Sequence, residues 1–108
     1  MGIHLRANEL RMKENIFNAY VDKVADLFSI TRDQLFSKSK NRNLVDARHL
    51  LFFLCYKRPM TIRYIQDFME KNGYKSGHST IIYGIEQVAT KVDSDPDYKT
   101  VIEDIQGA

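Results

Sequence analysis

The chain has 108 residues, 44% of them hydrophobic, which is enough for one compact domain (1–108) with an ordinary globular core. It contains no run of about eighteen apolar residues and no apolar signal-peptide segment, so we expect no membrane span, no export and a cytoplasmic protein. A single cysteine, Cys55, excludes an internal disulfide.

The charge is unevenly distributed. The net charge is only +2, but residues 38–63 hold seven Lys or Arg and one Asp, whereas residues 81–108 have a net charge of −4. A basic cluster of this kind is expected of a protein that binds phosphate groups, although charged runs are more often simply solvated surface.

The first half of the chain predicts two helices. Residues 9–29 have apolar side chains at helical spacing and predict a long amphipathic helix that supplies core. Thr31 and Gln34 have the spacing of a capping box and predict a short helix over 31–36.

Residues 37–43 contain no apolar side chain and predict an exposed, mobile loop. The loop has three cations: Lys38, Lys40 and Arg42. Residues 44–57 are apolar nearly all round and predict a helix through the centre of the domain, with Cys55 as a buried structural thiol. In its first turns, Arg48 is placed to extend to a phosphate, while we expect His49 to be half-buried or on the surface.

Residues 61–91 predict two helices joined by a glycine-containing turn. Thr61 caps the first helix and Asn72-Gly73 closes it. The apolar stripe of the second predicts one buried face, which comprises Ile81, Ile82, Ile85, Val88 and Ala89. Such a pair is the helix-turn-helix pattern, although any helical bundle contains helix pairs.

The second helix of this pair opens with small polar residues. His78, Ser79, Thr80 and Tyr83 lie in its first turns, beside unpaired amide groups that carry partial positive charge. These side chains are suited to contact phosphates and base edges, or equally to cap a surface helix.

The chain closes with a helix over 95–106, capped by Asp95 and opened by Pro96. No strand-like alternation appears anywhere in the sequence. The predicted fold class is therefore all-α, a helical bundle that contains a helix-turn-helix.

From about Val24 to Val88 the sequence resembles the C-terminal duplex-binding domain of the bacterial replication initiator DnaA. The matching pieces, in the family's order, are Val24-Ala25-Asp26-Leu27-Phe28, Ser37-Lys38-Ser39-Lys40-Asn41-Arg42, Ala47-Arg48, Thr61-Ile62 with Ile65, and Gly77-His78-Ser79-Thr80-Ile81. The last piece is similar to the family's signature Asp-His-Ser/Thr-Thr-Val, which opens its recognition helix. The resemblance implies an all-α, Trp-repressor-like fold.

The resemblance also implies a site. His78, Ser79 and Thr80 would contact bases and backbone in the major groove, and Arg42 would enter the adjacent minor groove. Lys40 and Arg48 would fall at backbone-contacting positions. The complete set of expected DNA-binding residues is Lys38, Lys40, Arg42, Arg48, Lys75, Ser76, His78, Ser79, Thr80 and Tyr83. No catalytic residue, metal ligand or cofactor is implied.

Three features depart from the family. Its signature aspartate is Gly77 here, the arginine before that aspartate is Ser76, and the turn from Glu70 to Gly77 is longer. The resemblance thus implies duplex binding without assigning the family's usual DnaA box. The chain also lacks a Gly-rich Walker sequence, so we do not expect it to be an ATP-driven initiator.

The leading hypothesis is a stand-alone module that binds double-stranded DNA with sequence preference, in replication initiation or transcription regulation. The alternative is a non-catalytic interaction domain that binds a replication or regulatory protein through its acidic C-terminal helix. An enzyme is not expected, because no nucleophile is paired with a base. The sequence predicts no oligomeric state.

Overall fold

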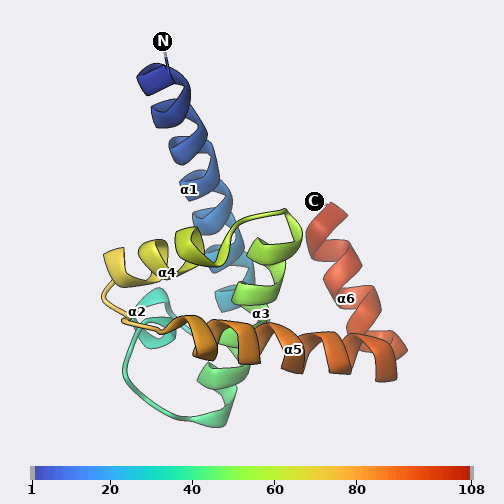
Figure 1. Cartoon of the computed structure of the whole chain (residues 1–108). Helices are drawn as coiled ribbons and strands as arrows, with labels where there is room; N and C mark the ends of the chain where they lie inside the picture. The colour runs from blue at the N-terminus through green and yellow to red at the C-terminus, as the bar shows by residue number, and fades with distance from the viewer. Residues whose placement is uncertain (1, 108) are drawn as a thin grey trace.

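The structure is a computed structural model that describes residues 2–107, with side chains described for residues 7–107. The described chain consists of helices joined by short connections (Figure 1). They are α1 (Gly2–Leu27), α2 (Arg32–Leu35), α3 (Arg42–Lys57), α4 (Ile62–Lys71), α5 (His78–Ser94) and α6 (Pro96–Gly107). No strand occurs within residues 2–107, and the predicted all-α class is confirmed.

Helix α3 is the centre of the core. Nine of its 16 residues are buried, and it packs against α1, α2, α4 and α5. This confirms the central helix predicted from its nearly continuous apolar sequence. Cys55 is buried and free, and burial raises the pKa of its thiol, as expected of a structural cysteine.

Helix α1 has two halves with different surroundings. Phe17, Val21 and Val24 in its second half are fully buried in the core. Its first half projects from the body of the molecule (Figure 1), and Leu10 there is 44% exposed. The helix begins at Gly2, earlier than the predicted residue 9, because the prediction followed the stripe of core residues, and the helix continues where that stripe ends.

The end of α1 depends on a serine in a left-handed conformation. Ser29 has φ of +55°, and the Ile30 amide donates to the Ala25 carbonyl at 2.9 Å. This pattern ends helices, and glycine usually supplies it. It stops α1 at Leu27, two residues before the predicted end.

Polar caps mark the starts of α2, α4 and α6, as the sequence predicts. Thr31 Oγ1 accepts from the Gln34 amide at 3.1 Å while Gln34 Oε1 accepts from the Thr31 amide at 2.8 Å, which completes the capping box. Thr61 Oγ1 accepts from the amide three residues later at 3.3 Å. Asp95 Oδ1 accepts from two amides of α6, at 3.0 and 3.3 Å.

Helices α4 and α5 form the predicted helix-turn-helix. Ile65, Phe68 and Met69 anchor α4 in the core, and Gly73, with φ of +92°, turns the chain after it. Helix α5 then crosses α3, and α6 packs back against α5 (Figure 1). No described helix is long and apolar enough to span a membrane.

Candidate nucleic-acid interface

The N-terminus of α5 is uncapped by side chains. Gly77 is the N-cap residue and has no side chain to accept from the first amides. His78, Ser79 and Thr80 follow it, and all three are exposed. None of them makes the capping bond that was the alternative explanation for these residues. The helix end therefore presents free amides and three polar side chains to solvent.

The segment 37–43, which its composition predicts to be a mobile exposed loop, is a strap with a regular set of local hydrogen bonds. Ser37 Oγ accepts from the Ser39 amide at 3.4 Å, Ser39 Oγ accepts from the Asn41 amide at 3.2 Å, and Asn41 Oδ1 accepts from the Asn43 amide at 2.9 Å. These small polar side chains alternate with the cations Lys38, Lys40 and Arg42, all of which are exposed. Alternation along the strap thus separates residues that bond the backbone from residues free to meet a ligand.

Arg42 is also not in a loop. It is the first residue of α3, which Asn41 caps, so α3 starts two residues before the predicted residue 44. The prediction missed this because it placed the helix start at the first apolar residue. The Arg42 side chain is nevertheless 87% exposed.

Arg48 is buried, which corrects the expectation that it extends to a phosphate. It is only 2% exposed. Its guanidinium donates to the carbonyls of Leu35 at 2.7 Å, Ser39 at 2.8 Å and Ser37 at 2.6 Å. Helical spacing could not predict this, because the carbonyls that bind Arg48 lie in the strap and in α2.

The turn between α4 and α5 exposes Lys75 and buries Ser76. Ser76 is 5% exposed, and its hydroxyl has no hydrogen-bond partner, so it does not present the polar surface group expected from the sequence. Its carbonyl accepts from Gln66 Nε2 at 2.9 Å, which fastens the turn to α4. The Tyr74 amide fastens it further by donating to the Met69 carbonyl at 3.0 Å.

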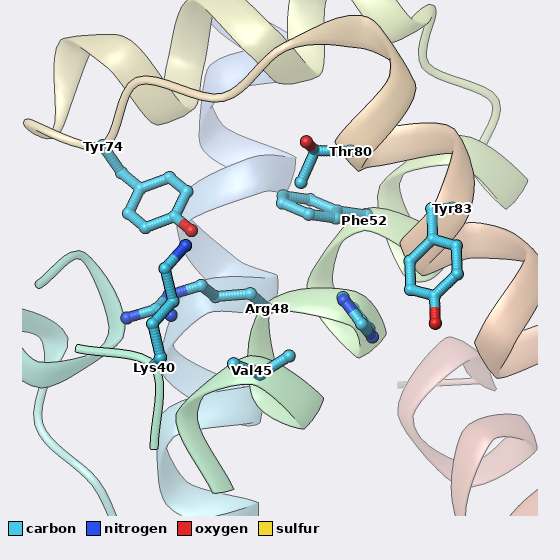
Figure 2. Close-up of a pocket in the computed structure, with 8 residues that line it drawn as sticks. Lys40, Val45, Arg48, Phe52, Tyr74, Thr80 and Tyr83 are labelled. Carbon is cyan, nitrogen blue, oxygen red and sulfur yellow. The ribbon is translucent and has the colours of Figure 1, made fainter. Parts of the chain in front are cut away.

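These parts meet around one hollow of about 220 Å³ (Figure 2). Strap, α3, turn and α5 all contribute to its lining, with Lys40, Val45, Arg48, His49, Phe52, Tyr74, Thr80 and Tyr83. A second hollow beside it is lined by Lys38, Lys40, Gly73, Tyr74 and Lys75. A third is lined by Arg42, Val45, Asp46, His49, Tyr83, Gln87 and Lys91. Because adjoining hollows share residues, the strap cations, Lys75 and the start of α5 lie on one continuous face, which we call the basic face.

One carboxylate lies within the basic face. Asp46 Oδ1 is 3.5 Å from Arg42 Nε and 3.7 Å from Lys91 Nζ. Neither Asp46 nor Lys91 was expected in the site, although Asp46 is the single acid in the basic segment and lies four residues after Arg42. The carboxylate offsets part of the positive charge at this end of the face.

Tyr83 and His49 form the contact between α5 and α3 at the basic face. Their rings meet edge to face with centroids 5.8 Å apart, and Tyr83 remains 56% exposed. Partial burial lowers the pKa of His49, which favours the neutral form of the imidazole. The half-buried position expected for His49 is confirmed.

The outward side of α5 is more apolar than predicted. Ile81 and Val88 are buried as expected, but Ile82 is 43% exposed and does not belong to the buried face. Ile82 lies on the same side of the helix as Ser79 and Glu86, which precede and follow it by three and four residues. This side extends the exposed surface of the helix N-terminus by two turns.

Among the described side chains, no group of three or more His, Cys, Asp or Glu could hold a metal ion. The fold and the basic face together define a helix-turn-helix protein whose second helix presents its N-terminus between cations. The chain belongs to the family described as bacterial dnaA protein helix-turn-helix, whose model matches residues 18–88. The resemblance seen in the sequence is thereby confirmed.

Two curated relatives are named chromosomal replication initiator protein DnaA. The protein of Pelobacter propionicus is 35% identical over 83 residues, and that of Lachnoclostridium phytofermentans is 24% identical over 83 residues. Each match covers 77% of this chain and 18% of the relative, so the chain spans less than a fifth of the length of these proteins. No solved structure matches the chain significantly.

Proposed function

We propose that this chain binds double-stranded DNA with sequence preference through its basic face. The observation that carries the proposal is the convergence of the strap, the α4–α5 turn and the exposed N-terminus of α5, which are separate in sequence, on one cationic surface. A duplex presents phosphates and base edges side by side, and such a surface complements both.

In this proposal the start of α5 enters the major groove. His78 and Ser79 face base edges, because the major groove distinguishes all four base pairs by hydrogen-bond pattern and by the thymine methyl. Thr80 and Tyr83 flank them on the side toward α3 and contact the base edges or the adjacent backbone. The free amides after Gly77 add a favourable site for a phosphate at the helix end.

Arg42 enters the neighbouring minor groove in this proposal. It is highly exposed where the strap joins the N-terminal end of α3, and the family implies this role for it. Lys38, Lys40 and Lys75 contact phosphates. These three cations line one hollow and have no ion-pair partner among the described side chains.

The two curated relatives are named as replication initiators, so we place the function of this chain in the control of replication initiation or of transcription. It acts there by occupying DNA, without catalysis. Recruitment of a regulatory protein through the acidic α6 is the alternative mode of action, and it leaves the basic face unused.

Selection of bound duplexes from a random pool tests the proposal. We expect enrichment of a defined sequence, whose preference at one or two positions changes in His78→Ala and whose A·T-versus-G·C preference relaxes in Arg42→Ala. Glu103→Gln, on exposed α6, is the control and should select the parental sequence. No enrichment by the parent, with the fold intact by circular dichroism, would reject sequence-preferring binding.

A further inference from the structure

We propose that Arg48 is a positioning residue that holds the strap and the helix-turn-helix in the arrangement needed for DNA binding, and that it does not contact phosphate itself. This inference rests on the proposed function. It differs from what the resemblance implies, which is a direct contact of Arg48 with the DNA backbone.

The guanidinium of Arg48 binds the backbone of the strap from its buried side. Nη2 and Nη1 donate to the Ser37 and Ser39 carbonyls at 2.6 and 2.8 Å. These carbonyls alternate with the exposed cations Lys38 and Lys40, so the bonds fix the backbone on both sides of Lys38 and immediately before Lys40. The alternating serine and asparagine bonds shape the strap, and Arg48 attaches it to α3.

The same guanidinium closes the end of α2. Nε donates to the Leu35 carbonyl at 2.7 Å, and Nη2 is 3.5 Å from the Gln34 carbonyl. The last carbonyls of a helix have no partner within the helix and carry partial negative charge, so a cation there is stabilising. One side chain thereby joins α2, the strap and α3.

Arg48 also contacts the helix-turn-helix. Its Cζ atom lies 4.6 Å from the centre of the Tyr74 ring, which belongs to the turn between α4 and α5 (Figure 2). Stacking of a guanidinium on an aromatic ring is favourable, especially away from water. The strap, with its phosphate-contacting cations, and the turn that precedes the recognition helix therefore share one anchor.

Only arginine fits this role. Its planar fork directs five donors at several acceptors at once, and it stays charged when buried. Lysine keeps the charge but offers three donors from a single atom and does not stack in the same way. Arg48→Lys therefore preserves a buried cation while releasing part of the strap.

Hydrogen exchange of the whole chain, without DNA, tests whether Arg48 holds the strap and the turn. In Arg48→Lys we expect faster exchange at the strap amides of Ser39 and Asn41, with little change at the α4–α5 core. Tyr74→Leu, which leaves the carbonyl contacts intact, should loosen the turn more than the strap. Unchanged exchange at the strap in Arg48→Lys would overturn the proposal.

A double-mutant cycle with Arg42 tests the functional half. Arg48→Lys should weaken binding to the selected duplex about tenfold, within the range of one lost specific contact, and should relax the A·T preference that we assign to Arg42. In an Arg42→Ala background Arg48→Lys should lower the affinity for the selected duplex by no more than about threefold, because the effects of two residues that act through one another are not additive. Independent effects, with the A·T preference retained, would instead show that Arg48 contacts phosphate directly.

Ile102→Ala on α6 controls for lost stability. It removes a buried side chain far from the strap and should lower the melting temperature at least as much as Arg48→Lys, while the A·T preference stays parental. If Ile102→Ala relaxes that preference equally, general destabilisation explains the effect and the proposal fails. If the parent binds no duplex at all, the functional proposal fails, and hydrogen exchange still decides whether Arg48 holds the strap.

Discussion

Gly84 on α5 packs against the imidazole of His49 on α3 so closely that a Cβ added to the glycine would lie 2.7 Å from His49 Cδ2. The same atom would lie 3.0 Å from Cδ2 of Phe52. A side chain at residue 84 would therefore force His49 or Phe52 to move. Because Gly84 has no side chain, α5 can lie this close to α3. The exposed start of α5 is held at the basic face by this contact.

Gly84→Ala should therefore destabilise the protein even though alanine favours helix. Overpacking costs about 1–3 kcal/mol, and the helix preference of alanine returns at most about 1 kcal/mol. We expect a net loss of about 1 kcal/mol in chemical denaturation, together with weaker duplex binding. His49→Ala should relieve the overlap, so the double variant should be more stable than the sum of the two changes predicts. Simple additivity would show that this contact does not set the helix spacing.

Asp46→Asn should strengthen DNA binding. The carboxylate pairs with both Arg42 and Lys91 and lies beside the arginine that is proposed to enter the minor groove of the negatively charged duplex, so its charge opposes binding. Because the pairs are at the surface, we expect a change in stability below about 0.5 kcal/mol, with affinity raised several-fold in low-salt titrations. Glu9→Gln breaks a matched i,i+4 pair with Lys13 on the projecting α1 and should leave affinity unchanged. Equal or weaker binding by Asp46→Asn would place Arg42 outside the interface.

Gly77→Asp should stabilise the protein and alter its DNA preference. A Cβ at residue 77 meets no atom within 4 Å, and φ of −81° suits any residue. An aspartate there accepts from the first amides of α5, and its negative charge interacts favourably with the positive end of the helix dipole. We expect the free energy of unfolding to rise by about 0.5–1 kcal/mol in thermal or chemical denaturation. Gly77→Asn caps without charge and separates the two contributions. A loss of stability in both variants would mean that the N-terminus of α5 is not free as described.

Ile82 should contribute to recognition of thymine. Its exposed side chain continues the outward side of α5 beyond Ser79, and apolar contact with the thymine methyl is a recurring form of base recognition. Replacing individual thymines of the selected duplex by deoxyuridine removes only that methyl. We expect one such position to weaken binding by the parent but not by Ile82→Ala. Equal sensitivity of both proteins at every position would assign the methyl contacts to other residues.

Local chemistry made much of the fold predictable. The caps at Thr31, Thr61 and Asp95 and the turn at Gly73 depend on residues within three positions of each other, so the sequence shows them directly. The central helix was equally clear, because α3 is apolar on nearly every side.

What the sequence did not reveal depends on contacts between distant residues. Arg48 is buried by carbonyls nine to fourteen positions away, and no periodicity within α3 reports them. The positions of α3 and α4 decide which faces of α5 are buried, and the apolar spacing within α5 does not. Ile82 lies outside those faces and is exposed. The strap was predicted to be a mobile loop because composition alone does not show that the side chains of Ser37, Ser39 and Asn41 each accept from the amide two residues later.

The salt dependence of duplex binding by the whole chain tests the central claim most directly. Contact with about four to six phosphates predicts that log affinity falls with log salt concentration at a slope of about −4 to −5. Lys75→Ala and Lys38→Ala should each make that slope shallower by about one. An affinity that stays flat between low and moderate salt, or that the lysine variants leave unchanged, would contradict DNA binding by the basic face and would favour a protein partner at α6.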